Sequence, residues 1–183
     1  MKRTVVVGML VALLGGAASA QTVHQRKENQ QDRIAQGVQS GQLTAGETAN
    51  LETKEAGLNQ EVRDDRAANG GKLTPAEQAQ VNRQQNGLSK QIYNDKHNAN
   101  AATYGKGVVG QRRENQQDRI AQGIRSGSLR PGQTANLENK ERGLNGEIAG
   151  DRAANGGKLT PAERKQVHHQ QNKLSRQIYR AKH

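Results

Sequence analysis

The amino-acid sequence predicts an all-α protein made of two tandem three-helix repeats joined by a flexible linker. A shift of 86 residues aligns residues 25–97 with residues 111–183 without a gap, and 52 of the 73 aligned positions are identical. Within each copy, apolar residues recur at helical spacing and helix-capping motifs precede them. No stretch alternates apolar and polar residues with period two, so strands are not expected.

The first segment of the chain, residues 1–20, is predicted to be a secretory signal peptide. It has a basic start, an apolar run from Val5 to Leu14 and an Ala-Ser-Ala sequence ending at Ala20, which is the layout of a cleaved signal. The run is too short to span a bilayer, so no transmembrane segment is predicted. The chain has no cysteine, which excludes a lipoprotein anchor, disulfides and thiolate chemistry. We expect cleavage near Ala20/Gln21 and a mature protein that is periplasmic or secreted.

Residues 25–97, the first copy, are predicted to form an opening helix followed by a helical hairpin. The hairpin helices carry their apolar residues in 4-3-4 steps, which gives a narrow seam of coiled-coil type. The opening helix is predicted to pack across the hairpin through Ile34 and Val38. The seam positions are Leu51, Glu55, Leu58 and Val62 in one helix and Val81, Gln85, Leu88 and Ile92 in the other. So thin a seam leaves open a pairing of the two copies, or of two chains, along the seams, and the sequence does not determine whether the repeats pack on each other.

The turn of the hairpin, "NGGKLTPAE", occurs at Asn69–Glu77 and again at Asn155–Glu163. It resembles a degenerate EF-hand loop, but the first three ligand positions would be Arg66, Ala68 and Gly70, which suit calcium poorly. The alternative is a joint between helices. The glycine pair ends one helix, and Thr74 and Glu77 form a capping box that starts the next at Pro75. We favour the joint, with calcium binding as the alternative.

The linker, residues 98–110, is rich in small residues, and the second copy, residues 111–183, repeats the helices with a different charge. Its seam positions are Leu137, Glu141, Leu144, Ile148, Val167, Gln171, Leu174 and Ile178. The first copy has ten Lys and Arg against ten Asp and Glu, a net of zero, whereas the second has fifteen against seven, a net of +8. Positive charge is therefore a property of the C-terminal repeat.

A basic stripe on the last helix is the candidate binding site. Its five residues step by 4, 4, 3 and 4 and share one helical face; they are Lys165, His169, Lys173, Arg176 and Arg180. The stripe predicts docking on a polyanion such as phospholipid headgroups, lipopolysaccharide, extracellular DNA or an acidic protein. The alternative is a solvated face of a basic protein.

Other chemistry is weakly supported. Glu55 and Glu141 lie on the seams, where a polar residue that fixes helix register is favoured over an acid–base pair, since no nucleophile is near. His168 and His169 are neighbours, point about 100° apart on a helix and do not suit a shared metal ion. We expect no enzyme activity, no cofactor and no metal site.

Three motifs of the mature chain resemble those of a group of secreted bacterial tandem-repeat proteins. The motifs are "RIAQGVQSGQLTAGE", "DRAANGGKLTPAE" and "IYNDKH", with second copies "RIAQGIRSGSLRPGQ", "DRAANGGKLTPAE" and "IYRAKH". The resemblance implies secretion and helical repeats with degenerate EF-hand-like turns, without a particular activity. The stretches "LTAGE" and "LTPAE" give a looser likeness to Spy/CpxP-type periplasmic chaperones, which are helical.

Together these patterns predict a secreted binding protein whose basic C-terminal repeat contacts anionic partners in the envelope or outside the cell. The alternative is a periplasmic chaperone-like or stress-related protein that holds other proteins along its helix seams.

Overall fold

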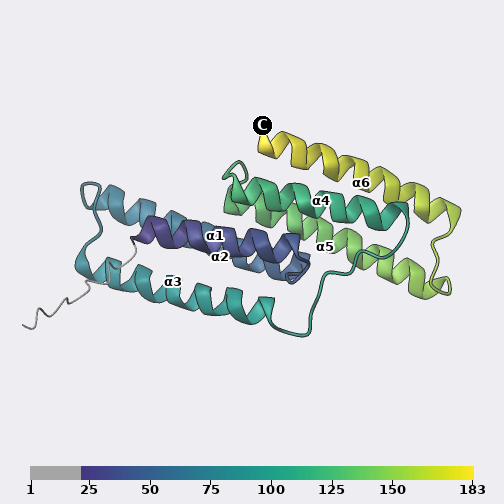
Figure 1. The fold of residues 1–183 in the computed structure, drawn as a ribbon. Coiled ribbons are helices and arrows are strands. Elements are labelled where there is room, and N and C mark those ends of the chain that lie inside the picture. The colour runs from purple at the N-terminus through teal and green to yellow at the C-terminus, as the bar shows by residue number, and fades with distance from the viewer. Residues whose placement is uncertain (1–21) are drawn as a thin grey trace, which may run out of the picture.

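The computed structural model describes residues 22–183, which form six helices and no strand (Figure 1). The helices are α1 (Val23–Gln39), α2 (Ala45–Ala68), α3 (Pro75–Lys96), α4 (Val108–Arg125), α5 (Pro131–Ala154) and α6 (Pro161–Lys182). The predicted all-α class and the two three-helix units, α1–α3 and α4–α6, are confirmed. Among these helices none is long and apolar enough to cross a membrane. The predicted signal peptide lies outside the described residues.

The repeated turn forms the predicted joint. Gly70 and Gly71 have φ of 63° and 90°, which is the left-handed region that ends a helix. Thr74 then caps α3: its Oγ1 accepts from the Glu77 N–H at 3.3 Å, and the Glu77 carboxylate accepts from the Thr74 N–H at 2.7 Å. The side chain of Asn69 donates to the same carboxylate at 2.8 Å. The turn at Asn155–Glu163 has equivalent bonds.

The start of α5 departs from this pattern because Arg130 replaces the capping threonine. No side chain caps the first turn at Arg130, and only Gln133 reaches back, where its Oε1 accepts from the Arg130 N–H at 3.0 Å. Pro131 occupies the first helical position and starts the helix without an N–H group. A helix therefore begins at this proline although the capping threonine is missing.

The connection between the repeats is shorter than predicted, because α4 begins at Val108 and takes up the last three residues of the predicted linker. The Ala102 N–H donates to the Gly41 carbonyl at 2.8 Å, and the side chains of Asn98 and Asn100 donate to the Glu47 carboxylate at 2.7 and 3.0 Å. The flexibility of this segment stays a prediction, and these bonds restrain it.

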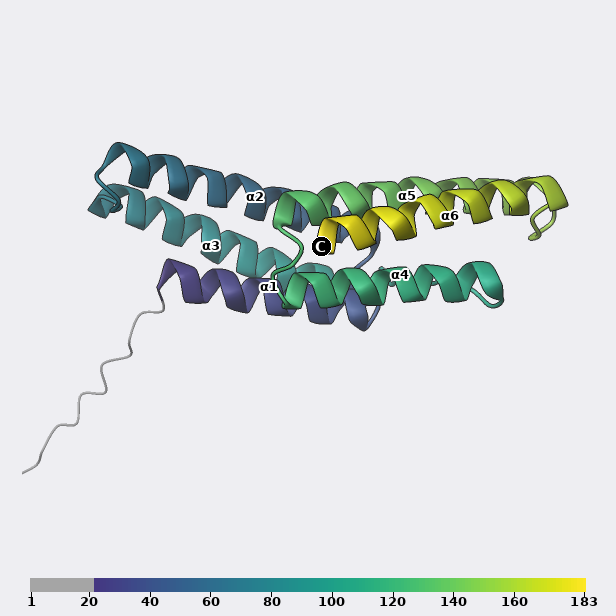
Figure 2. The same ribbon diagram turned by 90° about the horizontal axis from the view of Figure 1, so that it is seen from above.

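The two repeats pack against each other over a long interface in which α2 lies along α5 and α1 along α4 (Figures 1 and 2). Seen from above, they are staggered lengthwise and form an elongated molecule (Figure 2). The packing has an approximate two-fold symmetry. Gly46 of α2 lies close to Arg142 of α5, and the equivalent residues, Gly132 of α5 and Ala56 of α2, lie close to each other in the same way. The two copies thus pair within the chain, through faces that lie beside the seams and not along them.

The core has one central cluster and two outer ones. The central cluster takes residues from both repeats, including Ile34, Leu51, Ile120 and Leu137, all less than 5% exposed. The outer clusters are built around Val81 in the first repeat and Val167 in the second. The apolar seam positions are buried as predicted, and the central cluster joins the repeats into one core.

Candidate functional site

The predicted basic stripe lies on the outer face of α6, the last helix of the second repeat. All five side chains are exposed, whereas Val167, Leu174 and Ile178 on the opposite face are buried against the repeat. Helix α6 packs on α4 and α5, and its inner residues Leu174 and Ile178 belong to the central core cluster. The stripe residues are Lys165, His169, Lys173, Arg176 and Arg180.

Within residues 22–183 no carboxylate forms an ion pair with the stripe. The one ion pair among residues 22–183 joins His24 and Glu28 at 3.1 Å, far from α6 in the sequence. Like charges three or four residues apart on a helix repel each other by about 0.2–0.5 kcal/mol per pair. The stripe contains several such pairs, including Lys165 with His169 when the imidazole is protonated, and it therefore opposes helix stability slightly.

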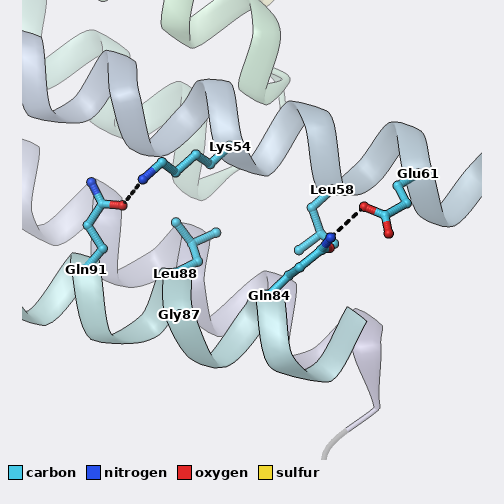
Figure 3. Close-up of a pocket in the computed structure, with 7 residues that line it drawn as sticks. All are labelled: Lys54, Leu58, Glu61, Gln84, Gly87, Leu88 and Gln91. Carbon is cyan, nitrogen blue, oxygen red and sulfur yellow. Dashed lines mark hydrogen bonds between the residues drawn. The ribbon is translucent and has the colours of Figure 1, made fainter. Parts of the chain in front are cut away.

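The matching face of the first repeat, on α3, has a different character. Its equivalent positions are Ala79, Arg83, Gly87, Lys90 and Asn94, all exposed, with only two permanent cations. A cavity of about 450 Å³ lies between α2 and α3, with Gly87 in its lining (Figure 3). The Gln84 Nε2 donates to the Glu61 carboxylate at 2.8 Å at one end, and Lys54 donates to Gln91 at the other (Figure 3). The second repeat has Lys173 at the position of Gly87.

A second group of cations lies at the outer end of the second repeat. A cavity of about 590 Å³ there is bordered by the start of α4 and by the turn between α5 and α6. Its basic lining residues are Lys106, Arg152, Lys158, Arg164 and His168, and its other lining residues carry no acidic side chain. The C-terminal repeat is thus positive on its outer helix face and at its outer end.

Four buried glutamates form the most unusual feature of the protein interior. Glu55 and Glu141, predicted as register-fixing seam residues, are 0% and 1% exposed, and none of their carboxylate oxygens has a hydrogen-bond partner. Glu52 and Glu138 are fully buried as well. Each accepts one bond, from Gln31 at 3.3 Å and from Gln117 at 3.0 Å respectively.

Burial controls the ionisation of these groups. It raises the pKa of Glu52 to about 8 and that of Glu55 and Glu141 to about 7. The pKa of Glu138 is raised well above its ordinary value by burial, with repulsion from Glu141 and Glu52 adding to the effect. The neutral form of these four carboxyl groups is therefore favoured at pH values below about 7.

Sequence reasoning missed Glu52 and Glu138 because they lie beside the seam, on the face that meets the other repeat. The signal available was the set of small residues sharing that face with Glu52, namely Ala45, Thr48 and Ala49, all buried. Small residues at helical spacing indicate a face that another helix approaches closely.

The histidines are dispersed. His97 and His183 stack on Tyr93 and Tyr179 at the ends of α3 and α6, His24 pairs with Glu28, and His168 lines the basic outer cavity. Within residues 22–183 no three His, Asp or Glu side chains are placed to hold a metal ion. The carboxylate that would be the terminal calcium ligand of the loop, Glu77, is bonded to Thr74 and Asn69 instead.

Comparison of the chain with protein-family models, curated proteins and solved structures finds no match. The resemblance to secreted tandem-repeat proteins therefore stays a prediction, and the function is argued from the site alone.

Proposed function

We propose that this is a secreted or periplasmic, non-enzymatic binding protein whose C-terminal repeat docks on anionic partners through the basic stripe of α6. The observation that carries the proposal is a row of exposed cations, from Lys165 to Arg180, without a carboxylate partner. With a rise of 1.5 Å per residue, the row is roughly 22 Å long. A polyanion of regularly spaced charges can contact such a row at several points.

The small repulsion within the stripe supports this function. A face that needs only to be solvated is more stable when cations alternate with carboxylates at helical spacing. The equivalent face of α3 avoids the repulsion with Ala79, Gly87 and Asn94. A partner that supplies negative charge accounts for cations being retained at the corresponding positions of α6.

The chaperone-like alternative requires apolar surface, and little is available among residues 22–183. The seam residues are buried, and the large hydrophobic residues exposed in this range are Tyr93, Val108 and Tyr179. Holding another protein along the seams would require the bundle to open. The alternative stays a prediction.

The test is the salt dependence of binding to heparin and to a short duplex DNA, measured by fluorescence anisotropy with the full mature chain. The stripe variant carries Lys165→Gln, Lys173→Gln and Arg180→Gln. Each lost phosphate contact lowers the slope of log Kd against log salt by about 0.9, so we expect a fall of roughly 2 to 3 in the slope and weaker binding at every salt concentration.

A control variant loses the same charge from the first repeat through Lys72→Gln, Arg83→Gln and Lys90→Gln, all at exposed positions. We expect it to keep most of the affinity and slope. Equal losses in the two variants would show that only net charge matters and would refute a docking face on α6. Binding that is insensitive to salt would favour the alternative function.

A further inference from the structure

The basic outer cavity, at the outer end of the second repeat, collects basic side chains from four segments of the chain. The start of α4 and the turn between α5 and α6 lie side by side at this end of the molecule (Figures 1 and 2). The volume of about 590 Å³ is within the range of small-molecule sites and admits a phosphate group. The basic residues come from the linker, the end of α5, the turn and the start of α6; they are Lys106, Arg152, Lys158, Arg164 and His168.

Within residues 22–183 no acidic side chain is paired with these basic residues. The lining of the cavity contains no carboxylate, and Asp151 and Glu163, which are adjacent to it in the sequence, form no ion pair with the lining. Glu163 accepts instead from the Thr160 N–H at 2.7 Å. Arg164 donates through Nη2 to the Leu159 carbonyl at 3.1 Å, which holds its guanidinium group beside the cavity. The positive charge is therefore available to a partner.

The lining of the cavity also includes an exposed apolar side chain. Val108, the first residue of α4, is 59% exposed, next to the buried side chains of Val109 and Leu159. The other large hydrophobic residues exposed among residues 22–183 are Tyr93 and Tyr179, whose rings stack on histidines. An exposed valine among unpaired cations indicates a partner that is both negatively charged and apolar.

The first repeat lacks this combination at the aligned positions. Thr22 is aligned with Val108, and its Oγ1 accepts from the Gln25 N–H at 3.2 Å and caps α1. The first turn of α4 has no side-chain cap. The second repeat thus gives up a helix cap and exposes a valine, which favours contact with a partner over folding. Two further differences replace a neutral amide by a basic side chain; the aligned pairs are Gln78 with Arg164 and Asn82 with His168.

We propose that the basic outer cavity contacts the headgroups of an anionic phospholipid surface. The lining cations contact lipid phosphate groups, and Val108 enters the apolar region beneath them. Each Lys or Arg near an anionic bilayer strengthens binding, and a buried apolar side chain adds to it. Heparin has no apolar part, and duplex DNA stacks its apolar base faces inside the helix. Neither of these polyanions offers Val108 a favourable contact.

This inference rests on the proposed function and specifies its partner. Arg164 and His168 directly precede the stripe residues Lys165 and His169 on α6. Successive residues of a helix point about 100° apart, so the basic surface continues from the cavity around the start of α6 into the stripe. A lipid surface that contacts this end of the helix reaches the cavity and the stripe together.

The first test measures co-sedimentation of the full mature chain with vesicles of phosphatidylglycerol mixed with phosphatidylcholine, and with vesicles of phosphatidylcholine alone. The outer-end variant carries Lys106→Gln, Lys158→Gln and Arg164→Gln, all at exposed positions. Each cation near the surface contributes about fivefold in affinity, so we expect binding to the mixed vesicles to weaken on the order of thirty- to hundredfold. The first-repeat control variant, which loses the same charge, should keep most of the affinity. Vesicles of phosphatidylcholine alone should bind weakly in every case.

The second test uses Val108 to separate a lipid surface from other polyanions. Val108→Thr, which reproduces the first repeat, should weaken binding to the mixed vesicles about two- to fivefold and leave binding to heparin and duplex DNA unchanged. The chain has no tryptophan, so Val108→Trp introduces a single fluorescent reporter. Its emission should shift to shorter wavelength with the mixed vesicles and not with heparin. Tyr93→Trp, at an exposed position of α3, is the control and should not shift with either.

The outcomes distinguish this inference from the proposed function. Equal losses in the outer-end and control variants, or a Val108→Trp emission that does not shift with the mixed vesicles, would overturn the lipid contact. Heparin and DNA binding that depends on the stripe, without binding to vesicles, would refute the lipid partner and leave the proposed function standing. A wild type that binds none of these polyanions would refute both. Circular dichroism of each variant shows whether the helices are intact.

Discussion

Replacing a buried glutamate of a helix seam by glutamine should stabilise the protein at alkaline pH and not at acidic pH. Glu55 is the clearest case, because it is fully buried and both of its carboxylate oxygens lack a partner. In Glu55→Gln the side chain keeps its shape and loses its ability to ionise. Glu141→Gln is the equivalent change in the second repeat.

The magnitude follows from the pKa. Burial raises the pKa of Glu55 from 4.5 to about 7, and each unit corresponds to about 1.36 kcal/mol. The stabilising contribution of the neutral carboxyl group is fully present below about pH 4.5 and is lost as the pH rises through about 7. The wild type should therefore lose roughly 3 kcal/mol of unfolding free energy for this group by about pH 8. Glu52, with a pKa of about 8, adds a loss over the same interval.

The assay is urea denaturation followed by circular dichroism at about pH 5 and about pH 8. Wild type should be markedly less stable at the higher pH, and Glu55→Gln should recover up to about 3 kcal/mol there, while changing the stability near pH 5 by less than about 1. Glu114→Gln, on the exposed face of α4, is the control and should have little effect at either pH. Equal wild-type stability at both values, or a Glu55→Gln variant that is destabilised at pH 8, would refute the assignment of neutral carboxyl groups.

Two further predictions concern packing. A Cβ at Gly123 would lie 2.6 Å from the side chain of Leu129, whereas one at Gly143 meets nothing within 4 Å. In denaturant melts, Gly123→Ala should therefore lower the unfolding free energy by about 1–3 kcal/mol, and Gly143→Ala should raise it by about 0.5–1 kcal/mol. Similar effects of the two changes would contradict the packing described. Residues 108–183 expressed alone should form a dimer, which sedimentation would detect. Removing the first repeat exposes the faces of α4 and α5 that packed on it, and the two-fold packing makes these faces complementary to copies of themselves. A stable folded monomer would count against the two-fold packing.

Most of the fold was predictable because its signals are local. Thr74, Pro75 and Glu77 specify the start of α3 within four residues, and the 4-3-4 spacing from Leu51 to Val62 specifies which face of α2 is buried against its hairpin partner. These features depend only on neighbouring residues, so they can be read without knowing what lies opposite. The exposed position of the α6 stripe followed from the same periodicity.

The interface and the cavity were not predictable, because they depend on contacts between distant segments. Glu52 looks like an ordinary solvent-facing glutamate until α5 is placed against it, and only then is it fully buried. Arg113 likewise appears as one of many basic residues, yet the linker at Tyr104 covers it. A single sequence carries the helical spacing of these residues but not the identity of the helix that packs on them.

The duplication separates two requirements, packing between the repeats and binding through the face of α6, that one repeat could not meet alone. The buried groups Glu52 and Gln31 and the buried seam residue Glu55 are identical in the second copy, as Glu138, Gln117 and Glu141. The outer face of α6 makes no contact with the first repeat, so its residues can differ from those of α3 without disturbing that packing. Stability should consequently respond to pH through the interface, whereas binding should respond to salt through α6. A rise in pH that weakens the interface should leave the start of α6 attached through the cluster around Val167, whereas Leu174 and Ile178 of the same helix belong to the central cluster that the two repeats share.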